Sequence, residues 1–220
     1  MSIPGLMSSM GGAVGVPKVS SLAYVANATA DSVSTITVPA SAAAGDLAVL
    51  CMGAWNTGAG GPADVAQAGW TTLLTTGPYY GRHKSVYKIL EAGDISASVN
   101  ILLGYLGYQV ACMFVFRPDV DITTVTIPSW IGGQAVPGDL AAQSIPASGG
   151  NAPLVCIGSM ESRDYPAVSR SPAFDLDVDF GSQMRNSYKI YNSSPANHTW
   201  NPGNAASEGL RSHAGYIEVE

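Results

Sequence analysis

The sequence predicts an all-β protein, a jelly-roll-like β-sandwich with an internal pseudo-two-fold repeat and an extended N-terminal arm. From Lys18 onward, short runs rich in Val, Ile, Thr and Tyr alternate with clusters of Gly, Pro, Asn and Asp, which is typical of a sandwich or jelly roll. Helical periodicity is absent apart from a single turn that 62–67 could form. A chain of 220 residues suits one large all-β domain, which we place at 18–220.

The second observation is that the chain repeats a series of motifs in the same order. The copies are 38–41 (VPAS) with 145–148 (IPAS), 51–53 (CMG) with 156–158 (CIG), and 85–89 (SVYKI) with 186–190 (NSYKI). A spacing of about 100 residues exceeds the roughly 20 to 50 of solenoid repeats. We therefore expect two halves, about 18–119 and 120–220, that supply similar strands. The alternative is chance similarity among strands rich in Ala, Val and Ser.

The N-terminal segment 1–17 is rich in Gly and Met and carries no charged side chain. It has neither a strand nor a helix period, so it should not pack as an element on its own. Such termini are ordered only when they are tied down, and we expect the segment to dock on a partner surface. Its candidate docking residues are Ile3, Pro4, Leu6, Met7, Met10, Val14 and Val16.

Strands follow in order along both halves. In the first half they are predicted at 19–25, 33–38, 46–54, 70–76, 83–91, 96–103 and 108–117. In the second half they are predicted at 123–127, 139–144, 153–159, 174–180, 185–191, 199–200 and 213–219. Ala-Gly-Asp at 44–46 and at 92–94 predicts tight turns. Because 47–52 and 111–116 are apolar throughout, both of their faces should be covered, one by the sandwich core and the other by a loop or a neighbouring subunit.

Composition narrows the functional classes. With 12% charged and 46% hydrophobic residues, the chain is too apolar for disorder. The ten Lys and Arg residues are scattered and the net charge is −6, so we expect no nucleic-acid partner. The sequence has neither a long apolar run nor a signal peptide, so we expect no membrane insertion and no Sec export. Cys51, Cys112 and Cys156 lie in apolar runs and are predicted to be buried free thiols.

Catalytic and metal-binding patterns are weak. There is no Gly-x-Ser-x-Gly elbow, and no cysteine and histidine form a recognisable nucleophile and base. His83, His198 and His213 lack metal-ligand spacing, and we interpret them as surface or hydrogen-bonded strand histidines. We therefore predict no enzymatic activity, no catalytic residues, no cofactor and no metal site.

Acidic residues leave two alternatives open. Asp175, Asp177 and Asp179 alternate with apolar residues, which predicts a half-buried strand whose carboxylates could share a calcium ion only with help from loop ligands. A pair of carboxylates suited to glycoside hydrolysis would require distant residues to converge. The residues concerned are Glu91, Asp94, Glu161 and Asp164.

Aromatic residues in or beside predicted loops are candidates for surface binding. Such rings can stack on sugars, anchor a protein interface or plug the ends of a sandwich. The candidates are Trp55, Tyr79, Tyr80, Trp130 and Trp200.

The order of motifs resembles a β-sandwich module of tailed-bacteriophage virion structural proteins, of the minor-tail or decoration type. In that family, P-A-x-x-x-x-G-D-L is followed by G-W, Y-[KR], A-G-D and an apolar strand that ends in F-R. The matching runs are 38–55, 68–74, 85–94 and 110–117. The resemblance covers about 33–220. The second half follows it more loosely and lacks the G-W, which leaves 166–172 unassigned.

The resemblance implies a structural protein of the virion, tail-associated or on the capsid exterior, made in the host bacterial cytoplasm. Its partners would be other virion proteins, with 1–17 as the docking arm. We expect a homo-oligomer, because symmetric copies multiply a modest contact. The alternative is a receptor- or carbohydrate-binding module at the particle surface that recognises a host surface glycan.

Overall fold

The computed structural model confirms the all-β prediction. Apart from one short 3-10 turn, η1 at Ala92–Asp94, every element of the described residues is a β-strand. No helix in these parts of the chain is long and apolar enough to cross a membrane. The residues described are 17–31, 34–55, 63–65, 67–76, 81–103, 108–135, 138–139, 143–146, 153–161, 169–171, 173–180, 184–193, 197–201, 204–205 and 210–220.

The first half forms one large and one small antiparallel sheet. The large sheet has five strands in the order β1-β8-β3-β6-β5, and the small sheet has three in the order β2-β7-β4. Residues 63–65, inside the possible helical turn 62–67, instead pair with β7, so the helical interpretation is wrong. The strands are β1 Leu22–Asp31, β2 Thr35–Thr37, β3 Leu47–Trp55, β4 Ala63–Val65, β5 Thr71–Thr76, β6 Gly81–Ile89, β7 Ser98–Leu103 and β8 Tyr108–Pro118.

The second half repeats this topology. Its large sheet runs β14-β15-β12-β18-β9 and its small sheet β11-β16-β13, so every strand of the first half has a counterpart. Only the two-stranded β10-β17 sheet is additional among the described strands. The strands are β9 Val125–Ala135, β10 Gly138–Asp139, β11 Gln143–Ile145, β12 Leu154–Glu161, β13 Ser169–Ser171, β14 Leu176–Phe180, β15 Met184–Tyr191, β16 His198–Asn201, β17 Asn204–Ala205 and β18 Leu210–Val219.

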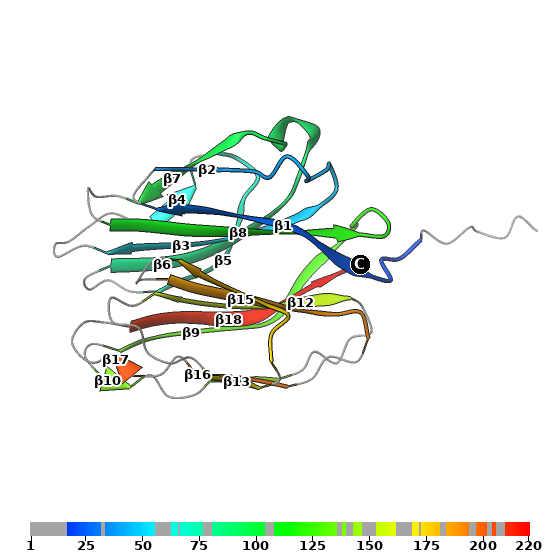
Figure 1. Cartoon of the computed structure of the whole chain (residues 1–220). Helices are drawn as coiled ribbons and strands as arrows, with labels where there is room; N and C mark the ends of the chain where they lie inside the picture. Colours follow the sequence, from blue (N-terminus) through cyan, green and yellow to red (C-terminus); the bar gives the residue numbers. More distant parts are fainter. Residues whose placement is uncertain are drawn as a thin grey trace, which may run out of the picture.

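The sheets are stacked in layers, with the two large sheets in the middle and the small sheets outside (Figure 1). β5 lies against β9 and β6 against β18, while β1 and β8 lie against β15. One hydrophobic cluster fills the space between the large sheets, and each half has its own cluster beneath its small sheet. The predicted repeat is therefore a repeat of whole two-sheet units packed back to back.

This stacking explains why strand β3 is apolar throughout. Leu47 and Val49 point into the core between the halves, whereas Ala48 and Leu50 point into the core of the first half. Neighbouring side chains on a strand face opposite sides, so a strand covered on both sides is expected to be apolar at successive positions. The prediction that both faces are covered is confirmed. The second cover is the other half of the same chain, so the expectation of a loop or a neighbouring subunit at this face is wrong.

The structural register of the repeat differs from the motif alignment at the cysteines. Cys51 pairs with Ser85 on β6, and the residue that pairs with Asn186, the counterpart of Ser85, is Ser159. The counterpart of Cys51 is therefore Ser159, and the match of Cys51 with Cys156 is wrong by three positions. Since side-chain direction alternates along a strand, an odd shift changes the face. Accordingly, Cys156 lies in the core of the second half.

Two motifs of the first half fasten strand ends together. Asp46, which is 1% exposed, accepts hydrogen bonds from Arg117 Nε at 2.9 Å and Nη2 at 2.8 Å and from the Ala43 amide at 2.8 Å. The preceding Gly45 has φ of +90°, a conformation that favours glycine. The G-D-L and F-R motifs thus form a clasp between the start of β3 and the end of β8, which we call the Asp46–Arg117 clasp.

Candidate functional site

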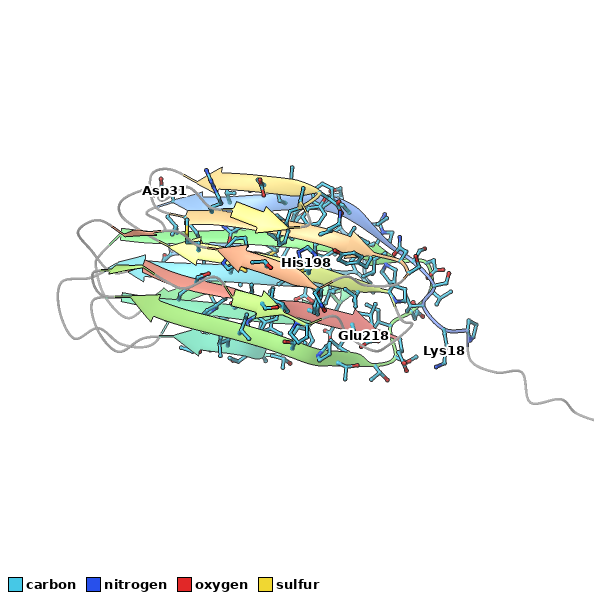
Figure 2. All side chains as sticks on the ribbon, turned by 90° about the horizontal axis from the view of Figure 1, so that it is seen from below. Lys18, Asp31, His198 and Glu218 are labelled. Atoms are coloured by element: carbon cyan, nitrogen blue, oxygen red, sulfur yellow. The ribbon has the colours of Figure 1, made fainter. Side chains whose placement is uncertain are left out.

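Residues 18–22, which follow the N-terminal segment and which we call its root, lie beside the C-terminus at one end of the sandwich. Figure 2 shows Lys18 and Glu218 at this end and Asp31 at the opposite end. Asp119, just after β8, accepts hydrogen bonds from the Ser20 amide at 2.9 Å and the Ser21 amide at 3.2 Å, and also from the Ser20 hydroxyl. These bonds, the Ser20 hydroxyl first, lower the pKa of Asp119 to about 2. The carboxylate therefore stays ionised and holds the backbone of the root.

The second half also holds this root. The Leu22 amide donates to Asn192 Oδ1 at 2.8 Å, and Asn192 Nδ2 donates back to the Leu22 carbonyl at 3.3 Å. Val19 is 5% exposed and belongs to the core between the halves. Lys18 forms an exposed ion pair with Glu220 at 3.8 Å. These contacts fix residues 18–22 against both halves.

A buried polar group occupies the centre of the interface between the large sheets. We call it the seam, and every one of its members is fully buried. The His83 and His213 rings stack with centroids 4.2 Å apart and planes 6° apart. The members of the seam are Cys51, His83, Ser85, Ser159, Asn186 and His213.

Hydrogen bonds link the seam across the two halves. His83 Nε2 lies 2.7 Å from Ser159 Oγ, which donates to Asn186 Oδ1 at 2.6 Å. On the other side of the stacked rings, Ser85 Oγ lies 3.2 Å from His213 Nδ1 and 3.5 Å from Cys51 Sγ. The seam therefore connects β3 and β6 of the first half with β12, β15 and β18 of the second.

Burial controls the charge of the seam. It lowers the pKa of His213 to about 3, so this imidazole is neutral at ordinary pH. It also raises the pKa of Cys51 to about 11, although the neighbouring hydroxyls of Ser85 and Ser159 act in the opposite direction. A serine within reach of an imidazole has the components of a nucleophile and base. Here both are enclosed between sheets, where their hydrogen bonds fix the relative position of the halves.

All three histidines are buried and hydrogen-bonded, which agrees with the strand-histidine interpretation and not with surface positions. His198 Nε2 lies 2.5 Å from Tyr191 Oη, and burial, followed by the charge of Lys189, lowers the pKa of His198 to about 4. Sequence reasoning missed the meeting of His83 with His213. The two residues occupy non-equivalent positions of the repeat, where the other half has Met184 and Cys112, respectively.

Two of the acidic candidates, Asp175 and Asp94, are engaged in protein contacts. Asp175 accepts from Lys189 Nζ at 2.9 Å and from the Ile190 amide at 2.8 Å. Asp94 accepts from Lys88 Nζ at 2.8 Å. No cluster of three or more potential metal ligands occurs among the residues that the structure describes. The side chains of Asp179 and Glu161, and Asp164 as a whole, lie outside those residues.

Trp200 is a clear correction to the sequence analysis, because it is fully buried and cannot present a surface for binding. A Cβ at Gly158 would lie 2.4 Å from the Trp200 ring, so the glycine provides the space that the ring fills. The indole Nε1 donates to Ser212 Oγ, and the ring meets Phe174 edge to face at 5.7 Å. Trp200 is thus a core residue of the second half.

The other candidates are either half-buried or outside the described residues. Trp130 is half-buried and packs against the core between the halves. Only the backbone of Trp55 is described, at the end of β3. Those outside the described residues are Tyr79, Tyr80 and the docking candidates Ile3, Pro4, Leu6, Met7, Met10, Val14 and Val16. Glycan recognition by the remaining aromatics stays a prediction.

Comparison with protein-family models, curated proteins and solved structures finds no match to this chain.

Proposed function

We propose that the protein is a structural component of a tailed-phage virion, tail-associated or on the capsid exterior, that docks through residues 1–17. The observation that carries the proposal is the root of this segment, which Asp119 and Asn192 bind from the two halves. An uncharged, partly apolar segment attached at a defined point of a well-packed body suits attachment to a neighbouring subunit. Ordering the segment would cost entropy, which burial of its apolar side chains offsets on assembly.

Two contacts between motif residues support the resemblance on which the virion assignment rests. The G-D-L and F-R motifs meet in the Asp46–Arg117 clasp, and the Y-K and A-G-D motifs meet in the Lys88–Asp94 ion pair. The first pair joins residues 71 positions apart and the second joins residues six positions apart, so in both cases motifs of the resemblance contact each other in the fold, and their joint presence carries more weight than each one alone. We propose that other virion proteins and further copies of this chain are its partners.

The test is incorporation into virions of the phage that encodes the chain. Three forms are compared: the full chain, a deletion of residues 2–17, and a chain in which 2–17 are replaced by Gly and Ser at equal length. Quantitative mass spectrometry of purified particles measures the copies per virion, and circular dichroism checks that each form folds. We expect both altered forms to fold and their copy number to fall at least about tenfold, since 1.4 kcal/mol of lost binding is already tenfold.

Lys18→Ala serves as the matched control, because it removes a charge at the root without touching residues 2–17. Its ion pair with Glu220 is exposed, and such pairs contribute little. This variant should be incorporated as the full chain is. Normal incorporation of the deletion form would refute docking through the arm, and absence of the full chain from virions would refute the virion assignment.

A further inference from the structure

Two of the three buried thiols stand opposite each other in one sheet. Cys51 on β3 and Cys112 on β8 are direct cross-strand partners. Both are fully buried and both belong to the core between the halves. Cys156 differs, because its cross-strand partners are Lys189 and Tyr216 and its side chain lies in the core of the second half.

The cross-strand position matches the geometry of a disulfide. Directly opposed residues of antiparallel strands have Cα atoms about 4.5 or 5.5 Å apart, according to the type of pair. Disulfides join Cα atoms that are about 4.4 to 6.8 Å apart, so either spacing suits a bridge between Cys51 and Cys112. A bridge from either residue to Cys156 would have to join side chains in two different cores, on opposite sides of a large sheet. Of the three possible pairings, the fold permits one.

We propose that Cys51 and Cys112 are a redox modification site, where an oxidant of the small-molecule disulfide class links β3 to β8 by an intrachain disulfide. The thiolate of one cysteine attacks a sulfur of the oxidant and releases the first small thiol. The thiolate of the other cysteine then attacks the mixed disulfide and releases the second. The two protons lost by the cysteines end on the two released thiols, and the oxidant is reduced by the two electrons that the cysteines give up.

The fold sets when this exchange takes place. Burial raises the pKa of Cys51 to about 11, and burial, together with the neighbouring Cys51, raises that of Cys112. The attacking species is the thiolate, so both cysteines react slowly while the strands remain paired. The disulfide therefore forms during folding, or when β3 and β8 separate. Once it has formed, burial of both cysteines shields it from reductants.

The bridge would stabilise the first half. It closes a loop of about 60 residues, and in the chain-entropy account a loop of this size raises the folding equilibrium constant by about a thousandfold. β3 is the central strand of the large sheet and pairs with both β6 and β8. A bond to β8 therefore connects the middle of the sheet with the strand that reaches the root of the N-terminal segment.

The first experiment refolds the full chain from urea in a buffer of reduced and oxidised glutathione. Remaining thiols are blocked by alkylation, and the disulfides are identified by peptide mapping under non-reducing conditions. The unfolded chain can form any of the three pairs, so the product reports which pair the fold selects. We expect Cys51 linked to Cys112 and Cys156 free. Predominant linkage to Cys156, or a refolded chain that keeps three free thiols across the range of glutathione ratios, would overturn the proposal.

A second experiment measures unfolding with and without dithiothreitol. The oxidised full chain should unfold at a higher urea concentration, and the shift should disappear on reduction. Cys156→Ser is the matched control, since it alters a buried thiol that has no cysteine opposite and should keep the shift. Cys112→Ser should abolish it. An equal shift in the Cys112→Ser variant, or no shift in the full chain when the linked peptide is present, would contradict a stabilising bridge.

Discussion

The buried histidine pair makes a quantitative prediction about acid stability. In the unfolded chain the imidazole of His213 has the ordinary pKa of about 6.5, whereas burial lowers its pKa in the folded protein to about 3. Between these values the unfolded state binds a proton that the folded state does not, so stability falls as the pH is lowered. The contribution of this histidine is fully present above pH 6.5 and is lost progressively toward pH 3.

The magnitude follows from the difference between the two pKa values. Each pH unit below 6.5 costs about 1.4 kcal/mol, so at pH 5 the folded state loses about 2 kcal/mol relative to neutral pH because of His213 alone. The groups that face this ring are Ser85 and the stacked His83, and its direct cross-strand partner on β12 is Ser159. No carboxylate among the described contacts of the ring would compensate for its charge.

The assay is urea unfolding of the full chain and of His213→Gln at several pH values between 7.5 and 4.5. Glutamine keeps a hydrogen-bonding group near Ser85 but does not titrate. The variant will be less stable at neutral pH, and the informative quantity is how the difference in unfolding free energy changes with pH. It should shrink by about 2 kcal/mol between pH 7 and pH 5.

His198→Gln provides the comparison. It removes the other strongly shifted histidine, with a pKa of about 4, from a different core. The pH-dependent changes in unfolding free energy that the two substitutions cause should be additive, because distant sites contribute independently. A difference between full chain and His213→Gln that stays constant from pH 7 to pH 5 would refute the reasoning, since it would mean that the imidazole titrates normally in the folded protein.

Three further substitutions test the packing. Asp46→Ala removes the buried acceptor of the clasp with Arg117 and should cost about 2 to 4 kcal/mol in urea unfolding, whereas a loss below about 1 would contradict the clasp. Gly158→Ala places a methyl group 2.4 Å from the Trp200 ring and should lower stability by about 1 to 3 kcal/mol, with a change in near-UV circular dichroism; an unchanged melting temperature would be evidence against the close contact. Lys18→Ala should change stability by less than about 1 kcal/mol, because its ion pair is exposed, and a larger loss would show that the root does more than the contacts indicate.

The sequence was sufficient to predict the fold class and the repeat because both depend on local patterns. Turn residues separate short β-rich runs, and the motif copies preserve the order of strands even where connecting segments differ in length. The apolar runs of β3 and β8 also correctly indicated strands covered on both faces. These features are readable because side-chain alternation and turn chemistry depend on neighbouring residues.

The predictions that were wrong, and the contact that was missed, depend on residues brought together from distant strands. The burial of Trp200 could not be predicted, because the space for its ring is created by the absence of a side chain at Gly158, on a different strand. The cysteine alignment failed because motif similarity does not determine which face of a strand a residue occupies. Likewise, no spacing rule relates His83 to His213, since their contact exists only after the two large sheets pack together.

The seam explains how a repeated fold keeps one arrangement of its halves. Two similar apolar sheets can pack in several registers at little cost, because hydrophobic contacts are non-directional. A hydrogen-bonded group inside that interface changes the balance, since a shifted register would break the hydrogen bonds that join His83 to Ser159 and Ser85 to His213 across the halves. The stacked rings of His83 and His213 arise from non-equivalent positions of the repeat, where the other half has Met184 and Cys112. Divergence of the two copies at these positions therefore favours the observed register, in which Asp119 and Asn192 bind the N-terminal root from the two halves.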